Sequence, residues 1–363
     1  AETNTLHLTW RRTYSHDEEW LLSLYRNHES NAESWVASSP SFPAVPLNRN
    51  RSSNRTNLEI QHRFALAPQA RLVWGLEGRR DDSEAPFLFA GGRPPSVSMY
   101  RAFSNLDWHL TPTWQLNLGG LLEKNGDVAA QFIPRAFINW QASPTDTFRA
   151  GYAKAWQQRN VFDIHGDVRA HTANSDPRTS VPVAWPYVPN PDLRTLSVDT
   201  VEVGYLGRFR AMDATLDLRL FNERVTNFVI RRNIPPAFAP LVLSALPSSQ
   251  FINLDSAVTL RGLEYQFRGK PRAGTEILFN HTLIERRTDE PEVAKRTAPY
   301  VASLSWLQDY GTGWTSTTSI LRMGSLAGGY GYVPGCDYTS RAYTSLDLRI
   351  ARAFQLDGRR AEI

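Results

Sequence analysis

The chain has 363 residues, of which 41% are hydrophobic and 21% charged, and its 40 lysines and arginines nearly balance 36 aspartates and glutamates. This composition excludes an intrinsically disordered polymer, and the near balance of charge gives no support to nucleic-acid binding. The single cysteine, Cys336, excludes an internal disulfide framework and a thiolate zinc cluster, and no apolar run approaches the roughly 20 residues of a spanning helix.

Apolar and polar residues alternate with a period of two along most of the chain, which is the pattern of β-strands with two different faces. In the segment 214–220, for example, every second residue is Ala or Leu, and the residues between are Thr, Asp and Arg. Most predicted strands have about ten residues or more, the length of a tilted strand that crosses a bilayer, whereas globular strands average about 5 to 6. In chain order, the predicted strands cover residues 3–14, 20–27, 56–65, 70–79, 98–110, 114–124, 132–141, 147–157, 197–209, 212–231, 251–268, 275–286, 298–308, 314–324 and 342–354.

The predicted connections alternate between short turns and long loops. Short turns such as 111–113 and 210–211 are separated by long loops such as 80–97 and 158–196. One rim with short turns and one with long loops is the arrangement of an outer-membrane barrel. We therefore predict an all-β fold, an antiparallel up-and-down transmembrane β-barrel. Residues 1–363 form a single partial domain with about 15 strands of a larger barrel.

The number of alternating strands indicates which face of the sheet meets water and which meets lipid. A closed sheet of this width encloses water or a plug, so its interior can be polar and its apolar face meets lipid. Trp108 and Trp114 flank one short turn, which is typical of the aromatic girdle at a membrane interface. The charged residues expected inside are Arg71, Arg79, Arg149, Arg219, Arg261, Arg349, Asp107, Glu202, Asp217, Glu264 and Asp347. Opposite charges on neighbouring strands then offset each other.

Three segments carry a family resemblance. Residues 190–193 read Asn-Pro-Asp-Leu before a predicted strand, residues 251–264 contain an Arg-Gly-Leu-Glu step after an asparagine, and residues 103–112 end in a Leu-Thr-Pro turn. In this order and spacing, they resemble TonB-dependent outer-membrane receptors. Residues 148–162 stand where that family has an arginine-aromatic strand and a Phe-Arg-Ala-Pro stretch, which is degenerate in this sequence.

The resemblance implies a barrel of about 22 strands plugged by an N-terminal globular domain. We expect the plug, the TonB-contacting box and the final strands to be missing from these 363 residues. The implied function is active import of a scarce large nutrient of the siderophore-iron, haem or cobalamin class across the bacterial outer membrane. The implied partners are outer-membrane lipid, a metal chelate or similar nutrient and, for the full-length protein only, the TonB complex.

The long loop 158–196 is the predicted ligand site, because aromatic residues and convergent polar groups are what a specific pocket needs. Haem receptors that the sequence resembles carry a histidine in this interval, and imidazole is a competent axial iron ligand, so haem is a minority hypothesis. The candidate ligand-binding residues are Arg159, Asn160, Asp163, His165, His171, Trp185 and Tyr187.

No catalytic motif of the hydrolase, metalloprotease or phosphate-loop type occurs in the sequence, so we expect no enzyme activity, no catalytic residues, no resident metal and no cofactor. Two alternatives stay open. A passive porin or adhesin-like outer-membrane barrel would conduct ions steadily without TonB. A soluble carbohydrate-binding β protein would pack its apolar strand faces against each other and stay in solution without detergent.

Overall fold

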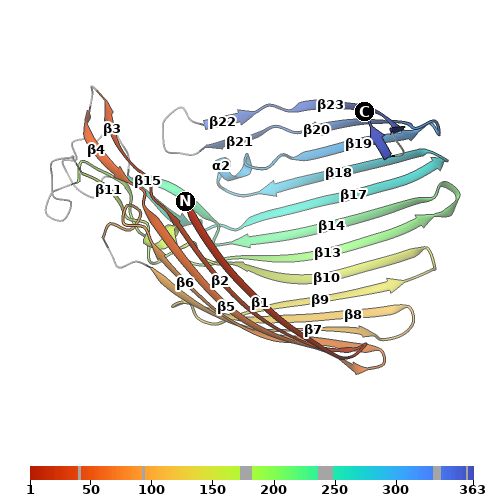
Figure 1. Cartoon of the computed structure of the whole chain (residues 1–363), viewed down its shortest axis with the longest axis horizontal. Coiled ribbons are helices and arrows are strands. Elements are labelled where there is room, and N and C mark those ends of the chain that lie inside the picture. The colour runs from red at the N-terminus through yellow and green to blue at the C-terminus, as the bar shows by residue number, and fades with distance from the viewer. Residues whose placement is uncertain (40–41, 92–94, 172–181, 236–247, 330–336, 357–358) are drawn as a thin grey trace.

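The structure is a computed structural model that describes the chain except residues 40–41, 92–94, 172–181, 236–247, 330–336 and 357–358. Its main feature is one antiparallel sheet of 16 strands, in which each strand pairs with the next along the chain that belongs to this sheet. Its strands, in order, are β1 (Glu2–Ser15), β2 (Glu18–Asn31), β5 (Arg51–Ala67), β6 (Ala70–Glu84), β7 (Ser96–His109), β8 (Trp114–Asn125), β9 (Gln131–Gln141), β10 (Asp146–Gln157), β13 (Leu196–Phe209), β14 (Ala214–Thr226), β17 (Val258–Arg272), β18 (Thr275–Arg287), β19 (Tyr300–Asp309), β20 (Trp314–Met323), β23 (Tyr343–Leu356) and β24 (Arg359–Glu362). Figure 1 shows this sheet as a curved wall with the short turns gathered at one end, which we call the turn end, and the long connections at the other, the loop end.

Smaller elements gather at the loop end of the wall (Figure 1). β3 (Ser34–Ser39) and β4 (Phe42–Asn48) form a hairpin, as do β21 (Leu326–Gly329) and β22 (Asp337–Ser340). A four-stranded sheet consists of β11 (Val168–Ala170), β12 (Ala184–Tyr187), β16 (Ser248–Asn253) and β15 (Val229–Ile234). The helices are short: α1 (Val161–His165), α2 (Pro291–Ala294) and the 3-10 turn η1 (Arg210–Met212), which lies at the turn end between β13 and β14.

The predicted all-β, partial up-and-down barrel is confirmed, and two predicted strands are each divided. The predicted strand 212–231 contains β14 and the first three residues of β15, and the predicted strand 251–268 contains the end of β16 and most of β17. Asn227 interrupts the first with a left-handed φ of 55°. Its side chain donates to the carbonyl of Thr195 at 3.0 Å, and Asn253 donates to the carbonyl of Asn227 at 2.8 Å. These bonds turn β15 and β16 out of the wall and into the smaller sheet.

A small hydrophobic core lies where the wall meets these loop elements. It consists of Val225, Ile230, Leu254, Val258 and Val293. These side chains come from the ends of β14 and β17, from β15, from the residue after β16 and from α2. The core therefore fixes the divided strands at the loop end of the wall. In the part of the chain that the structure describes, no second layer packs along the length of the wall (Figure 1).

The two faces of the wall differ in chemistry as the alternation predicts. One face, which we call the apolar face, carries large exposed side chains, and Leu348 and Ile350 are 70% and 71% exposed. The opposite, charged face carries ladders of arginines and carboxylates. One residue was placed on the wrong face. Arg261 was expected inside, but it lies on the apolar face because it is two residues from Leu263 on the same strand, and its neighbours across the strands are Asn222 and, beyond that, Val201.

Within the described part of the chain, none of the helices has the length and apolar character needed to cross a membrane.

Candidate functional site

The loop sheet, by which we mean α1 together with β11, β12, β15 and β16, is attached to the charged face of the wall. Gln158, the residue after β10, donates to Glu123 at 3.1 Å and accepts from Arg79 at 3.1 Å. The next residue, Arg159, donates to the carbonyl of Leu193 at 3.0 Å and to Asp127 at 2.7 Å. These bonds place the loop sheet over the charged face at its loop end.

A buried carboxylate holds the loop sheet together. Asp167 is 5% exposed and forms two bonds with Arg169, at 2.9 and 2.8 Å. It also accepts the indole N–H of Trp185 at 2.8 Å, and the guanidinium of Arg169 lies 4.8 Å from the centre of the Trp185 ring. The backbone of Asp167 bonds to residues 88 and 90 of the connection between β6 and β7. This one residue therefore joins two long loops that are far apart in the sequence.

Three aromatic rings form a second group in the loop sheet. Tyr187 stacks on Phe251 with ring centres 6.0 Å apart, and Phe162 meets Tyr187 edge-on at 5.0 Å. Arg231 donates to the hydroxyl of Tyr187 at 3.3 Å. Burial raises the pKa of the Tyr187 hydroxyl, and burial also raises the pKa of the Asp163 carboxyl in α1.

The structure places most of the predicted ligand-binding residues in the loop sheet, but their side chains differ in exposure. His165 and Asn160 are exposed, and Asn160 caps α1 by accepting the backbone N–H of Phe162 at 2.9 Å. Trp185, Tyr187 and His171 are buried, at 9%, 7% and 9% exposed. Arg159 and Asp163 are partly buried.

The haem hypothesis depends on the two histidines of this loop, which lie in different surroundings: His165 is exposed and His171 is buried. Among the residues that the structure describes, no three His, Cys, Asp or Glu side chains come together as a metal site. The role of either histidine in binding haem therefore stays a prediction.

The sequence analysis did not identify several residues that hold the loop sheet together. Asp167 and Arg169 lie inside the predicted loop but were not selected, whereas Phe251 and Arg231 lie near the predicted residues only in space, since Arg231 is 44 residues from Tyr187. Asp167 and Arg169 stand two residues apart, a spacing that puts side chains on one face of a strand, but nothing in the sequence shows that a tryptophan 18 residues away completes the group.

The charged face below the loop sheet consists of cross-strand ladders. Arg101 bridges Glu77 at 3.2 Å and Glu123 at 2.7 Å, across three neighbouring strands. A second ladder has Arg219 between Glu202 at 2.7 Å and Glu264 at 3.1 Å, and it continues to Arg149. Because every one of these arginines has a carboxylate partner, the ladders stabilise the wall and leave few cations for a ligand.

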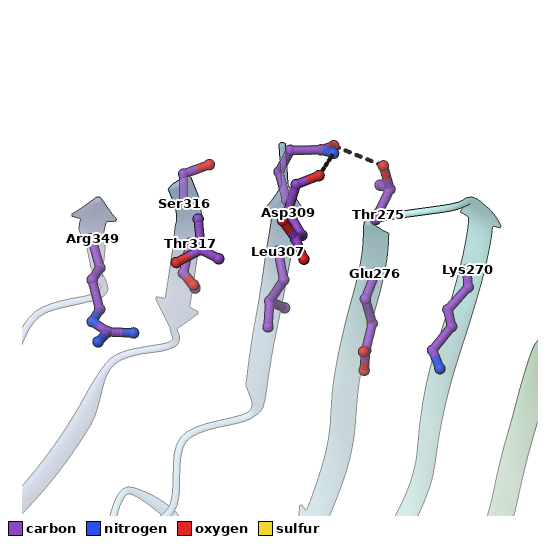
Figure 2. A pocket seen from close by; sticks show the side chains of 11 residues that line it. Lys270, Thr275, Glu276, Leu307, Asp309, Ser316, Thr317 and Arg349 are labelled. Atoms are coloured by element: carbon purple, nitrogen blue, oxygen red, sulfur yellow. Dashed lines mark hydrogen bonds between the residues drawn. The ribbon is translucent and has the colours of Figure 1, made fainter. Parts of the chain in front are cut away.

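A hollow of about 470 Å³ lies on the charged face at the turn end. Figure 2 shows Lys270, Glu276, Leu307 and Arg349 extending beside it from neighbouring strands, with Thr275 bonded to Gln308 at its rim. Arg268 pairs with Glu276 at 2.6 Å and Arg349 pairs with Glu362. The hollow offers few unpaired charges to a ligand, since Glu276 and Arg349 are both held in ion pairs. It is at the opposite end of the wall from the loop sheet.

Comparisons with known proteins agree with this architecture. The family model described as TonB dependent receptor-like, beta-barrel, matches residues 1–361. The siderophore receptor PirA from Acinetobacter baumannii has a similar fold, with a TM-score of 0.71 at 13% identity over 97% of this chain and 56% of that one. A mutant of the ferric enterobactin receptor PfeA from Pseudomonas aeruginosa, in complex with enterobactin, gives 0.74 at 14% identity over 98% and 55%.

A third solved structure, FpvA from P. aeruginosa bound to heterologous pyoverdines, has a TM-score of 0.64 at 13% identity and covers 96% of this chain and 50% of that one. No curated protein sequence matches the chain. The chain thus spans only about half the length of these receptors. Proteins of this family are outer-membrane transporters and not enzymes. The family model matches nearly every residue, and the strand order, the two unlike faces and the contrast between the turn end and the loop end agree with it. The chain therefore belongs to the TonB-dependent receptor β-barrel family of the bacterial outer membrane.

Proposed function

We propose that this chain is the wall and loop region of a receptor that imports a ferric siderophore, with its apolar face in outer-membrane lipid. The fold relatives named above are a siderophore receptor, a ferric enterobactin receptor and a pyoverdine-bound receptor, and this supports a ligand of the same class. The exposed leucines and isoleucines of the apolar face support the contact with lipid, since a face of this kind is unfavourable in water.

The observation that carries the proposal is the loop sheet at the loop end of the charged face. It combines aromatic rings with guanidinium groups, held by the buried Asp167 and by the bonds of Gln158 to the wall. Ferric siderophores are large, polar and often anionic ligands, and aromatic and arginine side chains offer them stacking and charge-assisted hydrogen bonds. We infer that the binding surface includes Asn160 and His165, with Trp185 and Tyr187 supporting it from below.

The receptor's work, on this proposal, is binding and passage and involves no covalent chemistry. The loop sheet captures the ligand at the outer rim, and the neutral ladders of the charged face leave the interior without a strong trap for it. Energy for passage comes from the TonB complex acting on a plug domain of the full-length protein. Steady ion conductance in a planar bilayer, unaffected by TonB, would instead support the passive porin alternative.

Quenching of tryptophan fluorescence tests the binding step on the full chain in detergent. We expect ferric enterobactin or a ferric pyoverdine to quench saturably, and His165→Ala to weaken the tighter of the two by about five- to tenfold. His16→Ala is the matched control, because His16 is also exposed but lies in a turn at the opposite end, with its side chain 90% exposed. Equal binding by both variants would place the site elsewhere, and no quenching by either ferric siderophore would refute the proposed ligand class.

A further inference from the structure

A groove of about 800 Å³ runs along the apolar face over β13, β14, β17 and β18. Its apolar floor is a row of directly paired side chains: Val203, Leu220, Leu263 and Leu283. Val203, Leu220 and Leu283 are 49%, 46% and 41% exposed, although the row to which they belong runs side by side across four adjacent strands. In Figure 1 these strands form the middle of the wall, away from both of its edges. This row of aliphatic side chains offers an acyl chain an apolar contact surface.

Polar residues replace this floor one row nearer the loop end. There the register pairs Val201 with Asn222, Asn222 with Arg261 and Arg261 with Glu285. One row further, the register pairs Asp199 with Arg224, Arg224 with Thr259 and Thr259 with Arg287. The groove and the surface beside it are therefore amphipathic, with aliphatic side chains toward the turn end and guanidinium groups mixed with two carboxylates toward the loop end. Arg261 lines the groove itself, and Arg224 and Arg287 lie beside it.

Two of these guanidinium groups lack a carboxylate, unlike the arginines of the ladders. Within the described ranges, Arg261 donates a hydrogen bond to the amide oxygen of Asn222 at 3.1 Å, and neither Arg261 nor Arg224 forms an ion pair. Asp199 lies opposite Arg224 in the register but pairs with Lys154 at 3.6 Å. Glu285 is already paired with Arg287 at 2.8 Å. Both arginines are exposed.

The two arginines are close enough to act on one anion. Asn222 lies opposite Arg261, and Arg224 is two residues further along the same strand, so Arg224 and Arg261 are diagonal neighbours on the same face. Such neighbours have their Cα atoms roughly 7–8 Å apart, which long side chains span easily. Two guanidinium forks at this spacing suit a phosphate group, whose oxygens accept paired N–H bonds from each.

We propose that this groove binds a membrane lipid with a phosphate headgroup, placing the phosphate between Arg224 and Arg261 and an acyl chain along Leu220, Leu263 and Leu283. The occupant is a lipid and not a soluble phosphate, because the cations lie at the end of an apolar groove and not in a polar pocket. This inference rests on the proposed contact of the apolar face with lipid.

Native mass spectrometry of the full chain, released from maltoside micelles, tests the site with defined probes. Phosphatidic acid carries a phosphate and two acyl chains, diacylglycerol carries only the chains, and glycerol 3-phosphate carries only the headgroup. We expect phosphatidic acid to remain bound at least about fivefold more than diacylglycerol, and millimolar glycerol 3-phosphate not to displace it. Displacement by the free headgroup, or equal retention of the two lipids, would overturn the proposal.

Substitutions locate the site. Arg224→Gln together with Arg261→Gln should reduce retention of phosphatidic acid by about fivefold for each arginine removed. Arg224→Lys together with Arg261→Lys keeps both positive charges and should retain most of the phosphatidic acid that the wild-type chain binds. Arg80→Gln is the matched control, because Arg80 is on the same face and 64% exposed but already pairs with Asp82 at 3.1 Å. Equal losses in the control and the double variant would show only a general charge effect and would sink the site.

The same samples separate this inference from the proposed function. Detergent is removed from the wild-type chain in a parallel experiment, and a chain that stays monodisperse in water would refute the contact of the apolar face with lipid. A chain that requires detergent but retains both lipids equally would refute only the phosphate site.

Discussion

The buried carboxylate of Asp167 offers the sharpest test of how the loop sheet is held. Asp167→Asn keeps the size of the side chain but removes the charge that Arg169 and the Trp185 indole face. Hydrogen bonds to charged groups contribute about 1.5–3 kcal/mol each, and Arg169 is about one-third exposed, which screens its share. We therefore expect the local free energy of opening to fall by about 2 kcal/mol.

Amide hydrogen exchange measures this change where it occurs. The N–H of Ala90 bonds to the carbonyl of Asp167 at 2.9 Å, and that of Val183 bonds to the carbonyl of Ala170 at 2.8 Å, so both report opening of the loop sheet. A loss of about 2 kcal/mol corresponds to about thirtyfold faster exchange at both amides, with little change in the wall. Asp192→Asn, at an exposed position of the same loop, is the control and should leave both rates unchanged. Exchange within about twofold of wild type in Asp167→Asn would refute the role given to this carboxylate.

Two further predictions concern the wall and α1. Gly151→Ala should destabilise the chain by about 1–3 kcal/mol in urea titrations in detergent, because a Cβ there would lie 2.2 Å from the ring of Phe137 on the neighbouring strand. Gly78→Ala, where the nearest atom is 3.9 Å away, should change stability by less than about 0.5 kcal/mol. Burial raises the pKa of Asp163, so folded α1 favours the protonated carboxyl, and this group's contribution becomes unfavourable as the pH rises through the raised value. The Gly166 amide reports opening of α1, because its N–H bonds to the carbonyl of Phe162 at 2.7 Å. After correction for intrinsic rates, Asp163→Asn should slow exchange of this amide at pH 7 and remove the increase in protection that the wild-type chain shows when the pH is lowered. A variant with the same pH profile as the wild type would contradict this.

The sequence by itself determined the strands, the two unlike faces and the class of barrel. These follow from a local rule, since side chains in a strand alternate between faces. The alternation of short turns with long loops can also be read directly from the sequence. The same rule also fails locally: the alternation runs on through Asn227 and Phe228, where the backbone turns out of the wall.

Only the tertiary structure decided where the loop residues lie and which charges are paired. Trp185 and Tyr187 belong to a sheet whose other half comes from residues 229–253, and bonds between the two halves join segments about 60 residues apart, such as Asn190 to Phe251. Arg219 and Arg261 look alike in the sequence, but the register gives Arg219 two carboxylates and leaves Arg261 an amide. The face of Arg261 follows from its alternation with Leu263, which the sequence already shows, but pairing across strands depends on register, so no local pattern could have named the two carboxylates that hold Arg219.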